Sequence, residues 1–382
     1  MLMKSLFFTG LMALLAVYSN AATTITPTVP AKDGGCYQIS NANELYGFAA
    51  IVNGDSTTTG SHFACGELTA NIVVNEGVLT EDGSLNVADT ADFIPWTPIK
   101  EYGGVFDGMG HTISGLYVND ENMVDVGLFG NFLPVTKNVE PTIIRNLGIV
   151  GSFLKGKTYV GAIVGSLMAS NDAKKRYKIE NCFNSSRIEG ELFAGGIAGY
   201  IGGLIKIKGC WNTGTISSGS CVGGIAGEIA LSGRTEFFAS VENSFNAGKV
   251  TGMVAGGIVS DVYENVRLMN CYNLGNVVGR GYAGGIVATF TYNCNSRIVN
   301  VYNAGKVENP DANMEEITPY LPNPIVADLY EECTSENTDH LPENAFFLNT
   351  SVSNEFLYDT IGVSTSAEMF ENGTVAYLLR NY

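Results

Sequence analysis

The sequence predicts an all-β protein: a right-handed parallel β-helix (β-solenoid) with an N-terminal capping helix and a short, partly helical C-terminal extension. Three observations predict this fold. A glycine-rich block recurs five times, a second block follows every copy of the first, and no helical pattern of about 10–15 residues separates the predicted strands. Because each strand is too short to bury its apolar face alone, we expect successive coils to stack about 4.8 Å apart and pair with their equivalents.

The first block has a Gly-Gly-Ile or Gly-Ala-Ile core. Its copies are Val160–Gly165, Ala194–Gly199, Val222–Gly227, Ala255–Ser260 and Ala283–Ala288, preceded by a degenerate relative at Val126–Gly130. Successive central isoleucines are 28 to 34 residues apart. We expect the extra residues of the longer units to lie in one loop, for example at Leu231–Thr235.

The second block begins with an apolar residue and ends with an aromatic residue followed by asparagine. Its copies are Ile179–Asn184, Ile207–Asn212, Val241–Asn246, Leu268–Asn273 and Ile298–Asn303. Glycine and asparagine tolerate the positive φ that corners between strands require. In a stack of coils the equivalent asparagines form a column, and their amides are predicted to hydrogen-bond along its axis.

These patterns divide the chain into five parts. They are a signal peptide (1–21), a linker (22–35), an N-terminal cap with the first coils (36–100), the repeat-containing β-helix (101–307), and an irregular acidic extension with a C-terminal cap (308–382). A solenoid needs caps because its terminal coils expose strand edges. The spacing of Asn41 and Glu44 resembles a capping box and predicts a helix over 41–53, which Gly54 can end.

The N-terminus has the three parts of a secretory signal. Lys4 precedes an apolar run, Leu6–Val17, and small residues follow it. The run is shorter than the ~20 residues that a membrane-spanning helix needs, and no later segment reaches that length. We therefore expect a secreted or cell-surface protein without a membrane-spanning segment.

Export to an oxidising compartment makes disulfides possible. The eight cysteines are Cys36, Cys65, Cys182, Cys210, Cys221, Cys271, Cys294 and Cys333. Their pairing cannot be read from sequence, but Cys36 and Cys65 are the best candidate pair because they bracket the predicted helix and lie close in sequence. A zinc site is disfavoured, because no Cys-x-x-Cys occurs and the chain has three histidines. We expect no metal and no cofactor.

The charge balance excludes some partners. Lysine and arginine total 21 against 38 aspartate and glutamate, which gives a formal charge of −17. A chain this acidic is a poor ligand for phosphate backbones, so nucleic-acid binding is not expected. Charged residues make up only 15% of the chain and hydrophobic residues 45%, a composition that excludes a disordered polyelectrolyte.

The aromatic residues of the second block are the candidate ligand-binding residues. They form one predicted column: Phe183, Trp211, Phe245, Tyr272 and Tyr302. Strict strand alternation puts Phe183 on the same face as Ile179, which favours a core position. A bulge at Asn181 would reverse the face and turn the column into an exposed ladder for sugar rings.

Evidence for catalysis is thin, and no catalytic residue is predicted. Asp107 and His111 lie close in sequence, but the glycines around Asp107 suit a turn in which its carboxylate accepts from backbone N–H groups. The repeats contain no Asp-Asp or Asp-x-Asp pair. Two acidic segments, Asn309–Glu316 and Glu331–His340, lack the spacing of an EF-hand and are expected to be solvated loops.

These blocks resemble the GLUG-motif repeat proteins, named for a Gly-Leu-x-Gly-like core. The resemblance covers roughly residues 36–307 and is carried by Trp96–Ile99, Phe106–Leu116, Val126–Gly130 and the Gly-Gly-Ile blocks. It implies a secreted bacterial protein, often at the cell surface. Similar repeats flank the catalytic parts of metallopeptidases that cleave immunoglobulin A, where they act as a stalk or binding scaffold. This chain has no His-Glu-x-x-His, so that chemistry does not carry over.

We therefore expect a non-catalytic, secreted or cell-surface scaffold that attaches to a polysaccharide or to another glycan of the cell surface or matrix. The alternative is a polysaccharide-acting β-helix enzyme, a lyase or a hydrolase. Two carboxylates about 5–10 Å apart on one face of the coils would favour the enzyme.

Overall fold

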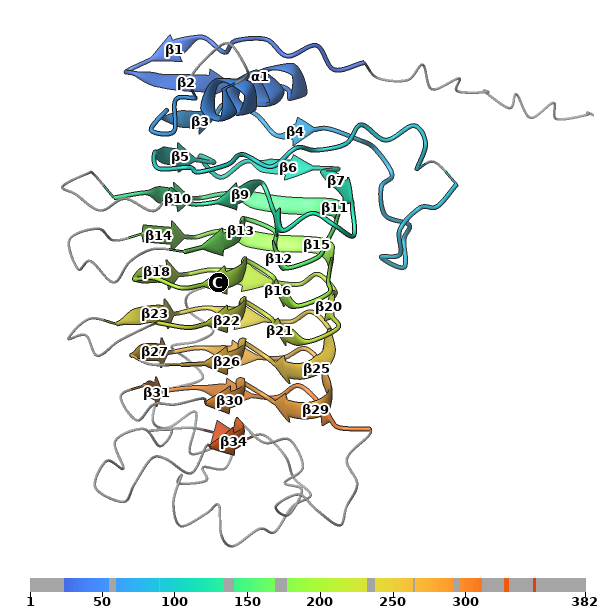
Figure 1. The fold of residues 1–382 in the computed structure, drawn as a ribbon, viewed down its shortest axis with the longest axis vertical. Helices are drawn as coiled ribbons and strands as arrows, with labels where there is room; N and C mark the ends of the chain where they lie inside the picture. Colours follow the sequence, from blue (N-terminus) through green and yellow to red (C-terminus); the bar gives the residue numbers. More distant parts are fainter. Residues whose placement is uncertain are drawn as a thin grey trace, which may run out of the picture.

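The protein is a stack of β-coils, closed at one end by a helix (Figure 1). This computed structural model describes residues 24–54, 60–88, 90–133, 141–168, 177–231, 238–263, 265–290 and 296–310, with the backbone of 326–329 and 346–347. The predicted parallel β-helix is confirmed, since three long sheets run along the stack. The predicted signal peptide, the acidic segment Glu331–His340, the part of the other acidic segment that follows Pro310 and the predicted C-terminal helices lie outside the described residues.

The first sheet has ten strands. They are β1 (Lys32–Asp33), β2 (Cys36–Ile39), β3 (Gly66–Leu68), β5 (Val105–Asp107), β10 (Ile143–Arg145), β14 (Tyr177–Glu180), β18 (Ile205–Lys208), β23 (Ala239–Glu242), β27 (Val266–Met269) and β31 (Arg297–Val299). The β1–β2 pair is antiparallel, and the other strand pairs of the described residues are parallel.

The second sheet has seven strands, and each strand except the last begins within a copy of the first block or its degenerate relative. They are β9 (Phe129–Asn131), β13 (Val164–Leu167), β17 (Ala198–Ile201), β22 (Ala226–Ile229), β26 (Val259–Val262), β30 (Val287–Phe290) and β34 (Val326–Leu329). The longer units carry their extra residues after this sheet: β17 and β18 are close in sequence, whereas the residues 168–176 separate β13 from β14.

The third sheet has eighteen strands of two to nine residues. They are β4 (Ile72–Val73), β6 (Thr112–Ser114), β7 (Tyr117–Asn119), β8 (Asp125–Val126), β11 (Gly148–Gly156), β12 (Tyr159–Gly161), β15 (Phe183–Gly190), β16 (Phe193–Gly195), β19 (Trp211–Asn212), β20 (Ile216–Ser218), β21 (Cys221–Gly223), β24 (Phe245–Asn246), β25 (Val250–Gly256), β28 (Tyr272–Asn273), β29 (Val277–Gly284), β32 (Tyr302–Asn303), β33 (Val307–Glu308) and β35 (Phe346–Phe347).

The interior of the stack is built from columns of equivalent side chains. The central isoleucines of the first block are completely buried: Ile163, Ile197, Ile225, Ile258 and Ile286. Burial of one such side chain stabilises the fold by about 1.5–3 kcal/mol. Because each coil repeats the same residue at the same place, the apolar core continues through all the repeats.

A second interior column consists of the asparagines that end the second block. Asn184 donates its side-chain amide to Asn212 Oδ1 at 2.7 Å, and Asn212 donates to Asn246 Oδ1 at the same distance. The ladder continues through Asn273 to Asn303 at 2.8 Å per bond. All five side chains are buried, and the predicted asparagine ladder is confirmed.

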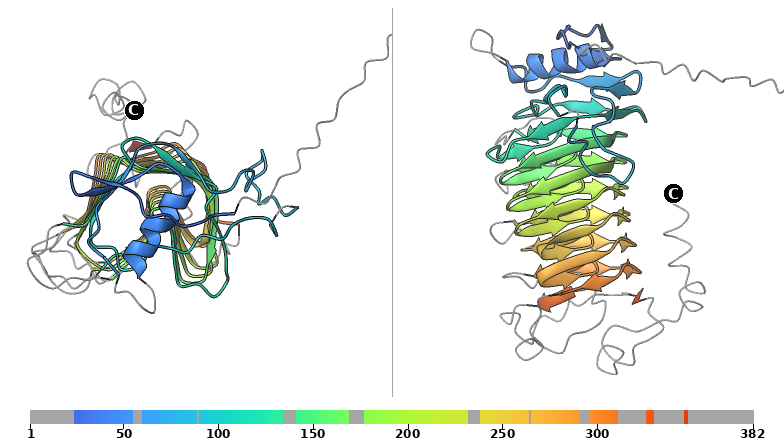
Figure 2. Two further views of the ribbon diagram at one scale, coloured as in Figure 1. Left: turned by 90° about the horizontal axis from the view of Figure 1, so that it is seen from above. Right: turned by 90° about the vertical axis from the view of Figure 1, so that its right-hand side faces the viewer.

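The helix α1 (Ala42–Asn53) covers the first coils, and seen from above it lies across the end of the stack (Figure 2). Asn41 accepts a hydrogen bond from the Glu44 backbone N–H at 3.1 Å, and the Glu44 carboxylate accepts from Ser40 N at 2.7 Å. Gly54 ends the helix with a φ of 64°. Asn41 is therefore the N-cap, as predicted, while the return bond from Glu44 reaches the residue before it; the buried face of the helix covers the apolar end of the core.

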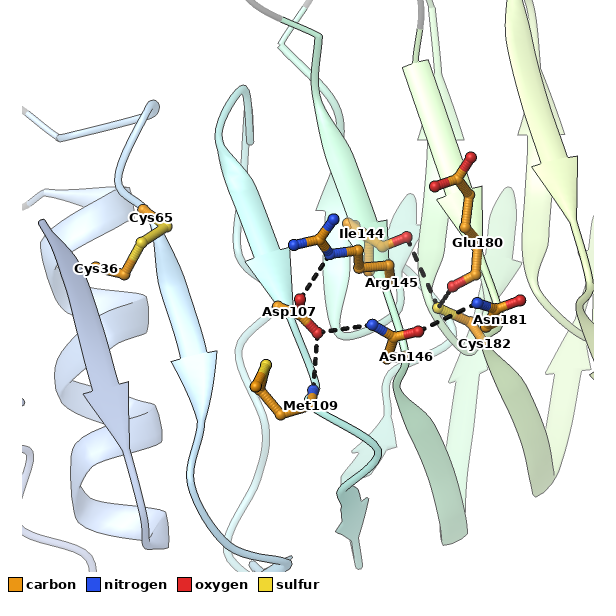
Figure 3. Close-up of polar contacts among 10 residues, drawn as sticks. All are labelled: Cys36, Cys65, Asp107, Met109, Ile144, Arg145, Asn146, Glu180, Asn181 and Cys182. Carbon is orange, nitrogen blue, oxygen red and sulfur yellow. Dashed lines mark hydrogen bonds and ion pairs between the residues drawn. A yellow bond between two sulfur atoms is a disulfide. The ribbon is translucent and has the colours of Figure 1, made fainter. Parts of the chain in front are cut away.

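A disulfide ties this cap together. Cys36 in β2 and Cys65, just before β3, are bonded, as their positions around the helix predict (Figure 3). The bond closes a segment with a sequence separation of 29 residues, which contains all of α1. It therefore holds the capping helix to the first parallel strands.

Candidate functional site

The aromatic column lies on the outer side of the coils. At the corner before it, Asn181 has a φ of 53°, and this left-handed residue breaks the alternation of the strand. Ile179 is consequently buried while Phe183 is only half-buried. Strict alternation, which favoured a core position, is therefore wrong at this corner. The other members, Trp211, Phe245 and Tyr302, are also half-buried, and Tyr272 is 7% exposed.

The rings of this column stack on one another. Phe183 and Trp211 have centroids 4.8 Å apart and planes within 5°, and Phe245 and Tyr272 are related by 4.9 Å and 6°. Trp211 and Phe245 are 6.2 Å apart and 8° from parallel. Because the ring faces cover one another along the axis, the column presents mainly ring edges sideways. It is an apolar ridge rather than a row of open ring faces.

Asp107 and His111, the pair considered for catalysis, are engaged with different partners. Asp107 accepts hydrogen bonds from Met109 N at 2.9 Å, Arg145 Nε at 2.6 Å and Asn146 Nδ2 at 3.0 Å (Figure 3). His111 Nδ1 lies 3.2 Å from Asn71 Oδ1. The predicted turn role of Asp107 is therefore confirmed.

The pKa of Asp107 reflects these partners. Burial alone would raise the pKa, but the hydrogen bonds from Met109, Asn146 and Arg145 and the charge of Arg145 outweigh burial. The pKa is consequently held below the usual value for aspartate. An ionised, fully engaged carboxylate of this kind is a structural anchor for the corner.

Sequence reasoning missed a second site, in which two carboxylates from different coils meet. Glu228 in β22 and Asp261 in β26 are directly paired positions of neighbouring parallel strands, and Tyr200 in β17 pairs with Glu228 on the other side. Glu228 and Asp261 are each the third residue after the central isoleucine of a first block. We call Glu228 and Asp261 the carboxylate pair.

The signal that could have found this pair is the register of the repeat. The two residues are far apart in the chain, so a search for Asp-Asp or Asp-x-Asp cannot detect them. Aligning the blocks on their isoleucines puts Tyr200, Glu228, Asp261 and Thr289 in one column, which matches the observed strand pairing.

Burial and mutual repulsion dominate the electrostatics of the pair. Glu228 is only 7% exposed, and its burial, together with the negative charge of Asp261, raises its pKa to about 8. Burial, with help from the same two carboxylates, raises the pKa of Tyr263 to about 12. Near neutral pH the Glu228 carboxyl group therefore holds its proton.

Three aromatic rings lie beside this pair. Tyr159 in β12 stacks on Phe193 in β16 at 5.6 Å and 26°, and Tyr200 contacts both, at 5.0 Å from Tyr159 and 5.7 Å from Phe193. All three side chains are half-buried and reach the surface. We call them the aromatic trio. Tyr200 connects the trio to Glu228, its paired position in the next coil.

The remaining cysteines and acidic groups offer little for metal binding in the described part of the chain. There, the one cluster with three metal-type ligands is Cys36, Cys65 and Glu67, and its two sulfurs are joined in the disulfide. Cys182 and Cys271 are buried thiols whose pKa burial raises, Cys271 to about 12, so they are chemically inert.

Among the described residues, no helix combines the length and the apolar character that crossing a membrane requires.

The fold and these sites define a capped, parallel β-helix with an aromatic ridge and a carboxylate pair on its coils. Among solved structures, the chain is similar to the 1.30 Å crystal structure of a "putative immunoglobulin A1 protease" from Bacteroides ovatus. The TM-score is 0.56 at 18% identity, over 91% of this chain and 88% of that one. At this identity the likeness shows the fold alone. No family model and no curated protein matches the chain, so the GLUG resemblance stays a prediction.

Proposed function

We propose that the protein is a secreted or cell-surface scaffold that attaches to an extracellular glycan and does not itself catalyse a reaction. The observation that carries the proposal is the aromatic column, which runs over five successive coils on the outer side of the stack. A ridge that repeats at the strand spacing offers equivalent contacts to a linear polymer lying along the axis.

Two further features support an extracellular role. The Cys36–Cys65 disulfide is typical of proteins that mature in an oxidising compartment. In addition, a parallel β-helix is a rigid, elongated support whose coils differ mainly in their loops, which suits a stalk or attachment module.

Retention on insoluble polysaccharides tests the proposal. The full chain is incubated with cellulose, chitin and xylan, and both bound protein and released reducing sugar are measured. We expect retention on at least one polymer without sugar release. The variant Trp211→Ala should lower retention by about tenfold, because it interrupts the ridge between Phe183 and Phe245. Tyr282→Ala, which removes an exposed aromatic residue outside the column, is the matched control.

The thermal unfolding of each variant is measured in parallel, so that lost binding can be distinguished from a failure to fold. Absence of retention on every polymer, or equal retention by folded Trp211→Ala and by the control, contradicts the proposal.

One observation favours the alternative, a polysaccharide-acting enzyme. Glu228 and Asp261 occupy paired positions of neighbouring strands about 4.8 Å apart, which puts two carboxyl groups on the same face of adjacent coils. Release of reducing sugar by the wild type, abolished in Glu228→Gln, would establish this alternative and overturn the scaffold proposal.

A further inference from the structure

We propose that the outer face of the first sheet binds a linear acidic polysaccharide, whose carboxylate or sulfate groups pair with a column of basic side chains. The column consists of Lys178 in β14, Lys206 in β18, Arg267 in β27 and Arg297 in β31, and we call it the basic column. This inference rests on the proposed attachment to a glycan and names the chemical class of glycan that the protein selects.

The register of the first sheet creates the basic column. Its strands lie one above another along the stack (Figure 1), and the paired positions run in the order Lys178, Lys206, Ser240, Arg267 and Arg297. The residue that follows each of these positions is a buried apolar residue of the core. Strand alternation therefore directs Lys178, Lys206 and Arg267 to the outside of the coils.

Positive charge is concentrated on this sheet, although the chain as a whole is acidic. The strands β10, β14, β18, β23, β27 and β31 together contain six basic and two acidic residues, whereas the whole chain has 21 basic and 38 acidic residues. Physiological salt screens charges over about 8 Å, while paired positions of neighbouring strands are about 4.8 Å apart. A ligand on the column therefore responds mainly to these cations rather than to the net charge of the chain.

Two members of the basic column face each other directly without a full complement of counter-charges. Lys178 and Lys206 are paired positions of β14 and β18, and like charges in such positions destabilise a sheet. Lys206 has an ion pair with Glu242 at 2.7 Å. Among the residues that the structure describes, Lys178 has no ion pair. An anionic group beside Lys178 would relieve this repulsion.

Arg267 is held in place by an aromatic ring rather than by a carboxylate. Its guanidinium carbon lies 3.6 Å from the centroid of the Phe238 ring, a contact that orients the planar group. Within the described part of the chain, its Nε finds no hydrogen-bond acceptor and no ion pair involves it. An oriented guanidinium of this kind favours a planar carboxylate or a sulfate group, which its N–H groups bind through two oxygens.

The width of the basic surface favours a single extended polymer. Beside the basic column runs a second column of paired positions, Arg145, Glu180, Lys208 and Glu242, in which the sign of the charge alternates from coil to coil. The second column therefore largely neutralises itself. A line of cations one residue wide matches a linear chain with charges at regular intervals, whereas a broad anionic surface would also meet the acidic remainder of the protein.

Calorimetry with matched ligands tests the inference. The full chain is titrated with a hexamer of galacturonic acid, with the methyl ester of the same hexamer, and with a heparin hexasaccharide. We expect at least one of the two acidic hexamers to bind at least about tenfold more tightly than the ester. Its affinity should fall as the salt concentration rises from about 50 to 200 mM. Comparison of the two acidic hexamers distinguishes carboxylate from sulfate as the preferred group.

Variants identify the site. Lys178→Gln and Arg267→Gln should each weaken binding of the preferred acidic hexamer by about tenfold, and Glu180→Gln, which removes a negative charge from the same strand as Lys178, should strengthen it. Lys249→Gln removes a positive charge from an exposed position between β24 and β25 and should bind like the wild type. Thermal unfolding should show Lys178→Gln to be no less stable than the wild type, because it removes a like-charge contact.

Equal affinity for the acidic hexamers and the ester, or unchanged affinity in folded Lys178→Gln and Arg267→Gln, overturns the inference. Tighter binding of a double-stranded DNA than of either acidic hexamer would overturn the assignment to a glycan. Failure of this inference is distinguishable from failure of the proposed function. Retention on neutral, insoluble polysaccharides that depends on Trp211 would remain if the basic column bound no acidic sugar.

Discussion

Asn212 donates its side-chain amide to the side-chain oxygen Oδ1 of Asn246 at 2.7 Å, although the two residues are separated by a whole coil of chain. Both side chains are buried in the interior of the stack. The bond exists because the backbone returns to the same place after each turn, one strand spacing further along the axis.

Removal of this amide should destabilise the fold. Asn212 also donates to Gly214 O and accepts from Gly214 N and Asn184 Nδ2. Asn212→Ala leaves several of these buried groups without partners, so we expect a loss of about 2–4 kcal/mol in the free energy of unfolding. Denaturant titration measures it, with exposed Lys249→Ala as the control. A loss below that of the control would contradict the buried ladder.

The anchor at Asp107 gives a second prediction. Asp107→Asn keeps the shape but removes the charge that Arg145, Asn146 and the Met109 N–H stabilise. We expect about 3 kcal/mol less stability at neutral pH. The pKa of Asp107 is lower in the folded state than in the unfolded chain. The contribution of Asp107 to the free energy of unfolding is therefore present above the pKa of the unfolded chain, and it is lost as the pH falls through the pKa of the folded state. The variant should lack this acid-dependent loss, and identical acid unfolding of both proteins would disprove the role.

The disulfide gives a third prediction. Replacing Cys36 and Cys65 with serine removes a link around about 30 residues and should lower the free energy of unfolding by about 3 kcal/mol. Because the link holds the cap, hydrogen exchange should increase most in α1. The wild type under reducing conditions is the comparison, and a double variant as stable as the oxidised wild type would contradict this account.

The carboxylate pair predicts an unusual pH dependence. Glu228 has a folded pKa of about 8, above its usual value, so the folded state holds a proton that the unfolded chain has lost. The contribution of Glu228 to the free energy of unfolding is therefore fully present below the pKa that Glu228 has in the unfolded chain. It decreases as the pH rises toward 8, by about 1.4 kcal/mol per unit of difference between the two pKa values. Glu228→Gln should remove this decline. A wild-type stability that does not fall between pH 5 and 8 would refute the buried environment of Glu228.

The sequence determined most of the fold because each structural element has a local signal. The isoleucine and asparagine columns follow from the repeat alone, and the helix follows from Asn41, Glu44 and Gly54. The face of the aromatic column did not follow, because it depends on the left-handed conformation of Asn181, a single-residue feature that strand periodicity does not contain.

The candidate site was harder to predict for a different reason. Glu228 and Asp261 belong to different repeats, and their pairing follows only from the register between coils. The raised pKa of Glu228 arises from burial, and burial depends on the packing of Tyr200 and other neighbours around the strand. The pairing of the two carboxylates and the burial of Glu228 therefore arise only when the coils are stacked, and no single repeat carries a signal for them.

Cross-linking between coils tests the stacking directly. Ser217 and Thr251 are paired across β20 and β25, so cysteines at these two positions should form a disulfide under mild oxidation, identified by peptide mapping. Cysteines at Glu189 and Thr251 are two coils apart, about 10 Å, and should not be linked. Linkage of the second pair, or failure of the first in folded protein, would contradict the winding on which the aromatic column and the carboxylate pair both depend.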